Sequence, residues 1–132
     1  MSLPGSTGYA FNRTRQTSLA THLTLAATHW SRFCGLMGRK AASFCTGDGL
    51  WIVPCRGVHT FAMKFPIDVI YLDTRKRVVH IEENLRPWRV AKVSFQTVSV
   101  LELPPHTLRS TQTTIGDEID IEMGQARGAS TT

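Results

Sequence analysis

Cys55, His59 and Met63 occupy every fourth position of one short segment. Side chains spaced by four residues share one face of an α-helix, so a helix here would align the three. A thiolate, an imidazole and a thioether together favour a soft metal, copper above all. The segment from Pro54 to Pro66 also contains a glycine, which weakens a continuous helix. Because buried cysteine and methionine more commonly fill a core, we expect no metal and no cofactor.

The same cysteine also permits a catalytic interpretation. His59 could lower the pKa of the Cys55 thiol, and Asp68 could orient the imidazole, as in enzymes with a cysteine nucleophile. Catalytic cysteine and histidine residues usually come from distant parts of a chain, and no family-type local signature surrounds Cys55. A cysteine-dependent enzyme is therefore an alternative and not the leading hypothesis.

Asp68 stands inside the apolar run 67–72, where strand alternation places it on the side of Ile70 and Leu72. If that side faces inward, an ionised carboxylate must be paired or hydrogen-bonded. Its expected partners are polar groups of the upstream segments: Arg32, His59, Thr60 and Lys64. Two roles remain open, a structural carboxylate that ties residues 54–66 to the sheet or a contact with a ligand.

Length and composition limit the classes of protein to consider. The chain has 132 residues, of which 42% are hydrophobic, and this suits one domain with a substantial core. The formal charge is +5, but the longest basic run, residues 75–77, is expected at a hairpin tip, so nucleic-acid binding is not favoured. No apolar stretch approaches the ~18 residues of a membrane helix. Three cysteines without a CxxC pair indicate reduced thiols and a cytoplasmic location.

Short alternating segments dominate the chain. The predicted strands are residues 18–26, 50–53, 67–72, 77–85, 98–103 and 118–122. A short helix is expected between Thr28 and Gly38, and a loop or single helical turn over 107–114. Asp73 should open a hairpin turn, and Gly116-Asp117 is ordinary turn chemistry.

These elements predict a mainly β domain, with α+β character minor. The expected fold is a small antiparallel barrel or jelly-roll-like sandwich with one or two short helices, because no long helices separate the strands. We predict a flexible N-terminal tail over 1–17, a single β-rich domain over 18–123 and a flexible C-terminal tail over 124–132.

Two stretches of the chain form a recognisable pattern. They are Arg-Phe-Cys-Gly-Leu-Met-Gly-Arg at 32–39, and Pro-Cys-Arg-Gly-Val-His-Thr-Phe-Ala-Met-Lys-Phe-Pro-Ile-Asp-Val at 54–69 with Leu72-Asp73 after it. Shorter matching fragments are Leu-Glu-Leu-Pro at 101–104 and Gly-Asp at 116–117. Together they resemble the DUF192 family, also called UPF0127, from about Leu19 to Ile121.

The resemblance implies a compact β-rich domain with a barrel-like or jelly-roll-like sheet, and it implies no particular activity. Carried over by motif position, the recurring residues are Arg32, Gly35, Leu36, Met37, His59, Thr60, Met63, Asp68 and Asp73. Where relatives commonly have a glycine after Leu-Glu-Leu, this chain has Pro104-Pro105-His106, so the turn departs from the family pattern.

The leading hypothesis is a domain that binds a small ligand between the Arg32 segment and the Cys55–Asp68 segment. The predicted ligand contacts are Arg32, Cys55, His59, Thr60, Met63 and Asp68. The alternatives, in order, are a structural or protein-interaction domain, an enzyme using Cys55, His59 and Asp68, and a nucleic-acid-binding regulator. The expected partner is a small molecule and not a membrane, and the sequence does not indicate which molecule.

Overall fold

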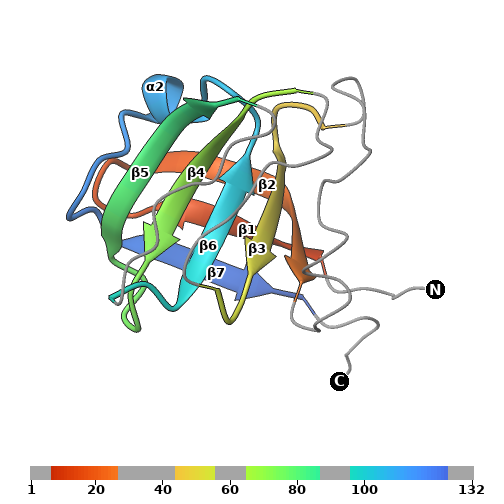
Figure 1. The fold of residues 1–132 in the computed structure, drawn as a ribbon. Coiled ribbons are helices and arrows are strands. Elements are labelled where there is room, and N and C mark those ends of the chain that lie inside the picture. The colour runs from red at the N-terminus through yellow and green to blue at the C-terminus, as the bar shows by residue number, and fades with distance from the viewer. Residues whose placement is uncertain (1–6, 27–43, 56–64, 87–95, 125–132) are drawn as a thin grey trace.

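The computed structural model describes residues 7–26, 44–55, 65–86 and 96–124 (Figure 1). Within them the elements are β1 (Thr7–Asn12), β2 (Thr17–Ala26), β3 (Asp48–Ile52), β4 (Ile67–Leu72), β5 (Val78–Leu85), β6 (Ser99–Leu103), α2 (Thr107–Thr111) and β7 (Ile119–Met123). The strands join into one sheet in the order β5-β4-β6-β3-β2-β1-β7.

The sheet curls until its two edge strands approach each other. Figure 1 shows β5, β4, β6 and β3 on the near side and β2, β1 and β7 running behind them. The edges meet where Arg77, just before β5, pairs with Glu118, just before β7. Backbone bonds from Val78 N to Asp117 O and from Ile119 N to Lys76 O, at 2.8 and 2.9 Å, hold this junction. The predicted mainly β, barrel-like fold with a short helix is confirmed.

One strand pair departs from the antiparallel prediction. β2 and β3 run parallel, with Leu23 opposite Gly49 and Leu25 opposite Trp51, while the other pairs are antiparallel. A parallel pair needs a long connection that returns the chain to its starting edge. The stretch from Ala26 to Asp48 supplies that length, and the sequence pattern of the strands carried no sign of direction.

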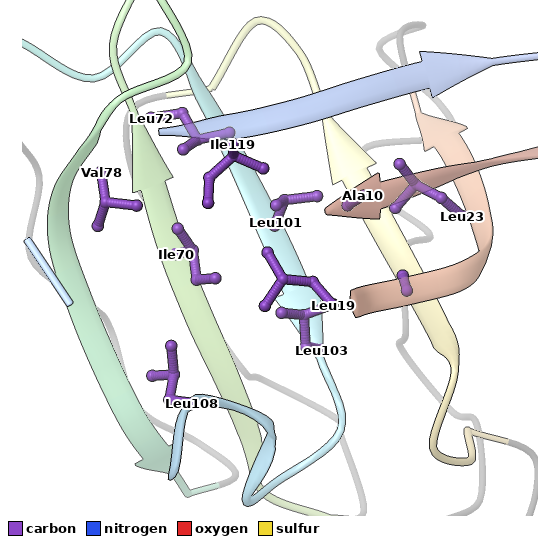
Figure 2. Close-up of a cluster of buried hydrophobic side chains, with 11 residues drawn as sticks. Ala10, Leu19, Leu23, Ile70, Leu72, Val78, Leu101, Leu103, Leu108 and Ile119 are labelled. Atoms are coloured by element: carbon purple, nitrogen blue, oxygen red, sulfur yellow. The ribbon is translucent and has the colours of Figure 1, made fainter. Parts of the chain in front are cut away.

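The inner side of the curled sheet holds the first of two hydrophobic clusters. We call it the interior cluster: Ala10, Leu19, Ala20, Leu23, Ile70, Leu72, Val78, Leu101, Leu103, Leu108 and Ile119. Figure 2 shows labelled side chains of β4 and β6 meeting those of β1 and β2, with Leu108 of α2 at one end. Residues from both halves of the sheet therefore bury each other, which stabilises the curl.

The opposite side of β3, β4 and β6 carries the second cluster. We call it the outer-face cluster: Ala26, Phe44, Leu50, Ile52, Phe65, Ile67, Val69, Tyr71 and Val100. Alternation along each strand separates the two sets, so that Ile67, Val69 and Tyr71 face outward while Ile70 and Leu72 face inward. β4 is thus buried on both sides, as its nearly continuous apolar sequence suggests.

The predicted strands correspond closely to β2 through β7. The hairpin after β4 also forms as expected, because Oδ1 of Asp73 accepts hydrogen bonds from the backbone N of Arg75 and of Arg77, both at 2.9 Å. The predicted helix between Thr28 and Gly38 lies outside the described residues. The predicted turn over 107–114 contains α2.

The prediction of a loose tail over residues 1–17 was wrong for residues 7–12, which form β1. This strand pairs with β2 on one side and β7 on the other. A Cβ at Gly8 would overlap the backbone carbonyl oxygen of Glu122, so glycine is needed where β1 passes β7. β1 has weak strand propensity of its own and is held by its two neighbours. The other predicted domain boundaries stay predictions.

No helix in the described part of the chain has the length and apolar character needed to cross a bilayer.

Candidate functional site

Of the six residues predicted to contact a ligand, the structure describes two. Arg32, His59, Thr60 and Met63 lie outside the described residues, as does Lys64, an expected partner of Asp68. Cys55 and Asp68 lie inside.

Asp68 points into the curled sheet, on the side of Ile70 and Leu72 that alternation predicted. Its exposed fraction is 0%. Oδ1 accepts a hydrogen bond from the backbone N of Asn84 at 2.8 Å, and Oδ2 accepts one from the backbone N of Leu108 at 2.8 Å. Both carboxyl oxygens are therefore occupied by backbone groups of β5 and α2, which sequence reasoning did not name.

These contacts give Asp68 a structural role at one end of the fold. α2 begins after His106, whose side chain makes no capping hydrogen bond, so Asp68 supplies the acceptor that the first turn of the helix lacks. Asn84 has a positive φ of 57°, and its backbone N is held by the same carboxyl. Burial raises the pKa of Asp68, and the hydrogen bonds from Leu108 and Asn84 oppose the rise.

Cys55 lies on the other side of the sheet. It follows β3, packs against the outer-face cluster, and donates its backbone N–H to the carbonyl oxygen of Val98 at 2.9 Å. The structure does not bring Cys55 and Asp68 together, because the wall formed by β4 and β6 separates the two side chains. This geometry leaves the proposed catalytic set of Cys55, His59 and Asp68 without its carboxylate.

Polar groups that the sequence did not single out gather near Cys55. We call the set the outer polar group: Cys55, Tyr71, His80, Glu82 and Glu102. Strand pairing explains their proximity. Val69 of β4 lies opposite Glu82 of β5 on one side and Glu102 of β6 on the other. His80 lies opposite Tyr71 two pairs further along, and so on the same face. Residues in direct cross-strand pairs project on the same face, here the outer one.

Glu102 is the most unusual member of this group. It is the fourth of the five residues of β6, has an exposed fraction of 5%, and lies between the outward-facing Leu50 and Val69. Burial raises the pKa of its carboxyl from 4.5 to about 8, and no contact from the described part of the chain offsets that rise. At neutral pH this carboxyl is therefore mostly protonated and is a hydrogen-bond donor as well as an acceptor.

The Tyr71 hydroxyl is the second unusual group. The side chain is fully buried, and the hydroxyl has no hydrogen-bond partner in the structure described. Burial raises the pKa of Tyr71, and the nearby Glu82, Cys55 and Glu102 raise it further. The hydroxyl is thus surrounded by acidic groups from three separate segments.

His80 and Glu82 complete the group from β5. Nε2 of His80 lies 3.0 Å from Oε2 of Glu82, and both side chains are partly buried. The His80 ring also meets the Tyr71 ring edge-on, with centroids 5.0 Å apart. This contact orients the imidazole between the phenol and the carboxylate.

The outer polar group provides hydrogen-bond chemistry and not a preformed metal centre. Among the described residues, no group of three or more His, Cys, Asp or Glu side chains is arranged to hold a metal ion. A protonated carboxyl and a phenol can each donate one hydrogen bond and accept others, which suits recognition of a polar ligand group. The same signal that drew attention to Asp68, an acid inside a buried strand, was present at Glu102 in Ser99–Leu103.

Comparison with models of known protein families shows which family the chain belongs to. Residues 10–121 match the model of DUF192, described as an uncharacterized ACR. The chain belongs to the DUF192 family. The predicted resemblance is therefore confirmed, and it extends slightly further toward the N-terminus than the motifs suggested.

Known relatives agree with this assignment. The DUF192 chain is 30% identical over 123 residues to a UPF0127 protein of Thermococcus sibiricus, covering 89% of this chain and 77% of that protein. A solved structure of a protein of unknown function from Novosphingobium aromaticivorans matches with a TM-score of 0.75 at 20% identity, over 87% of this chain and 84% of that one.

A second solved structure, from Sinorhizobium meliloti, matches with a TM-score of 0.70 at 18% identity, over 88% of this chain and 92% of that one. Its description proposes a role in transcription regulation for that protein. At these identities the two structures establish the shared fold of the DUF192 chain alone.

Proposed function

We propose that this DUF192 chain is a small-ligand-binding module, and that its ligand lies against the outer face of β4, β5 and β6. The ligand contacts Glu102 and the Tyr71 hydroxyl, with Cys55 beside them. We place this activity in the cytoplasm, because an odd number of cysteines without CxxC pairs suits a reducing compartment.

The observation that carries this proposal is the buried Tyr71 hydroxyl, which has no hydrogen-bond partner among the described residues, beside the buried carboxyl of Glu102. A buried hydroxyl that makes no hydrogen bond costs roughly 1–3 kcal/mol, and native proteins keep few of them. Glu102 adds a buried carboxyl on the same face of the sheet, and no described contact stabilises this carboxyl in its charged form. A ligand that hydrogen-bonds to both groups offsets these costs, which is the usual design of a binding site.

The residues that flank two further segments support keeping the other predicted contacts in the proposed ligand set. Ala26 and Phe44 precede and follow the segment that holds Arg32, and both belong to the outer-face cluster. The segment that holds His59, Thr60 and Met63 lies between Cys55, which packs against the same cluster, and Phe65, which belongs to it. We therefore keep Arg32, Cys55, His59, Thr60 and Met63 in the proposed ligand set. Asp68 is left out, because it faces the interior and both its oxygens are occupied.

The test is to look for a bound molecule in protein purified without added ligand. Native mass spectrometry of the full chain should show a mass above that of the polypeptide, and denaturation should release a small molecule. The Glu102→Gln variant should lose it. Glu122→Gln, which alters an exposed glutamate of β7, is the matched control and should retain it.

A bare polypeptide mass for the native protein, together with no thermal stabilisation by a broad metabolite library, would show that the outer face does not bind a ligand. If Glu102→Gln fails to fold, Tyr71→Phe serves in its place, because it removes a single hydroxyl from the same site.

A further inference from the structure

Burial is the largest cause of the raised pKa of Tyr71, and the three side chains that raise this pKa further are all acidic. Glu82 belongs to β5, Glu102 belongs to β6, and Cys55 lies just after β3. Each of the three raises the pKa of the Tyr71 hydroxyl. Ionisable groups of one sign from three separate segments therefore converge near one buried point, and each makes that point more negative when it loses its proton.

Among the described residues, the basic side chain next to the Tyr71 ring is His80, and it is already paired with Glu82. Its Nε2 lies 3.0 Å from the Glu82 carboxylate, whereas no basic side chain of the described residues offsets the burial of Glu102. A ligand that brings one positive charge to Glu102 would complete the balance on this face.

Resting on the ligand-binding role proposed above, we propose that the ligand presents a positively charged nitrogen, an ammonium or guanidinium, to Glu102 and the Tyr71 hydroxyl. On binding, the Glu102 carboxyl loses its proton to solvent, and the resulting carboxylate accepts a hydrogen bond from the ligand nitrogen. The Tyr71 oxygen accepts a second. One proton leaves as one positive charge enters, so the net charge of the buried site does not change.

Other ligand charges fit the face less well. An anionic group would approach Glu82 and, once ionised, Glu102, and like charges at short range in a buried site repel strongly. A metal cation needs several ligands, and no three suitable side chains converge in the described residues. A charge-assisted hydrogen bond from a nitrogen cation to a carboxylate needs one acceptor and is about twice as strong as a neutral one.

Proton release makes the affinity depend on pH. Below the pKa of Glu102, near 8, the cation must displace a proton, so affinity should rise about tenfold per pH unit between pH 6 and 7 and level off above pH 8. Close to one proton should be released per cation bound at pH 6, and few at pH 9. These two readouts belong to a titrating partner, and a merely structural Glu102 would produce neither.

The experiment uses the full chain stripped of bound molecules, in phosphate buffer free of amines. The cationic probes are butylamine, putrescine and agmatine, the matched controls are butyrate and butanol, and zinc is tested separately. Binding is followed by thermal unfolding between pH 6 and 9, and proton release by a pH electrode in weakly buffered solution.

We expect at least one cationic probe to stabilise the protein, with the stated pH dependence and proton release. Glu102→Gln should weaken that binding at least tenfold, whereas Glu83→Gln, next to the site on β5 but exposed and paired with Arg109, should not. The proton count on the unaltered protein keeps the inference testable if Glu102→Gln does not fold.

Stabilisation by butyrate, butanol or zinc alone, lost in Glu102→Gln, would overturn the cationic inference and leave the ligand-binding role standing. A co-purified molecule that proves neutral or anionic would do the same. Absence of both a co-purified molecule and any probe binding would remove the two proposals together.

Discussion

Glu102 shows how one residue can link stability to pH. The protonated carboxyl tolerates its buried position, whereas the carboxylate does not, so the folded state holds the proton more tightly than the unfolded chain does. Tyr71 adds a hydroxyl that is buried without a partner in the described structure. Both residues place a polar group in a buried position where an apolar one would be more stable, which is typical of functional positions.

We predict that the ligand-free protein becomes less stable as pH rises from 5 to 9. The pKa of Glu102 is raised from 4.5 to about 8 on folding, so the native state binds more protons across that window and stability falls with increasing pH. The loss attributable to this residue is on the order of 4 kcal/mol. Urea unfolding at several pH values measures it. Glu102→Gln should show a much flatter profile, and an equally steep profile in the variant would contradict the assignment.

Tyr71→Phe should leave the ligand-free protein as stable as before or more stable by up to about 1 kcal/mol. The substitution removes a buried hydroxyl without a described partner and keeps the ring that packs against His80. Urea unfolding at pH 7 gives the comparison. A loss of more than about 1 kcal/mol would mean that the hydroxyl is hydrogen-bonded in solution.

Individual residues were predictable from the sequence to different degrees. Alternation in residues 67–72 correctly placed Asp68 with Ile70 and Leu72 on the inner side. Its partners could not be found this way, because the backbone N–H groups of Asn84 and Leu108 carry no side-chain signature. Glu102 was visible as an acid in an apolar strand but was passed over, since the sequence does not show which of two strand faces bears a site.

At the scale of elements, the end of β5 and the start of α2 both depend on Asp68 of β4, which precedes them in the chain by 16 and 40 residues. α2 is five residues long and has no side-chain cap of its own. So short a helix is not stable in isolation, and it persists here through Asp68 and the packing of Leu108 in the interior cluster.

Asp68→Asn should destabilise the protein by about 2–4 kcal/mol, because the amide offers one acceptor oxygen and turns an N–H group toward a second backbone donor. The effect should be local as well as global, with faster amide hydrogen exchange at Leu108 and Asn84. Asp120→Asn on β7, where the side chain is half-exposed, is the control and should change stability by less than about 1 kcal/mol. Unchanged exchange at both amides would refute the capping role.

Elements with a strong local sequence signal were easier to predict than elements that form only because neighbouring strands pair with them. β4 and the hairpin after it are encoded locally, by an apolar run followed by Asp73 and its backbone hydrogen bonds. β1 is not, since Gly8 and Ala10 bury little surface and the strand forms because β2 and β7 offer hydrogen bonds on both sides. The parallel direction of β2 and β3 was equally hidden, because direction depends on a connection and not on a strand.

At the scale of the whole molecule, a buried polar network fastens the β1–β2 turn to the region before β7. Nδ2 of Asn12 donates to Oδ2 of Asp117 and to Oγ1 of Thr113, both at 2.9 Å. Arg15 Nε also donates to Asp117, at 3.1 Å. The sequence indicated an ordinary turn at Gly116-Asp117, but Asp117 is buried and joins segments about a hundred residues apart.

Asn12→Ala should cost about 2–4 kcal/mol, because it leaves the buried Asp117 carboxylate with fewer donors. Arg13→Ala, in the same turn but exposed and ion-paired with Glu118 and Asp120, should cost less than about 1 kcal/mol. Chemical denaturation of the two variants side by side gives the contrast. Equal losses would show that the buried network is no more important than the surface ion pairs.

Acid should weaken the same network. Burial alone would raise the pKa of Asp117, but hydrogen bonds from Asn12, Thr114 and Arg15 outweigh it and hold the pKa below 3.8. The stabilisation is therefore complete above pH 3.8 and is lost as pH falls through the lowered pKa. Unfolding between pH 5 and 2 should show this loss in the unaltered protein and a smaller one in Asp117→Asn.

A single layer of β-sheet separates the interior cluster from the outer polar group. In β6, positions 101 and 103 line the inside and positions 100 and 102 the outside, and β4 is divided in the same manner. Removing or adding one residue within β6 would exchange its two faces and turn Glu102 toward the apolar interior, and the same change within β4 would turn Tyr71 inward. We therefore expect family members to differ in residue type along β4 and β6 but to conserve the count of residues, with insertions and deletions confined to the connections.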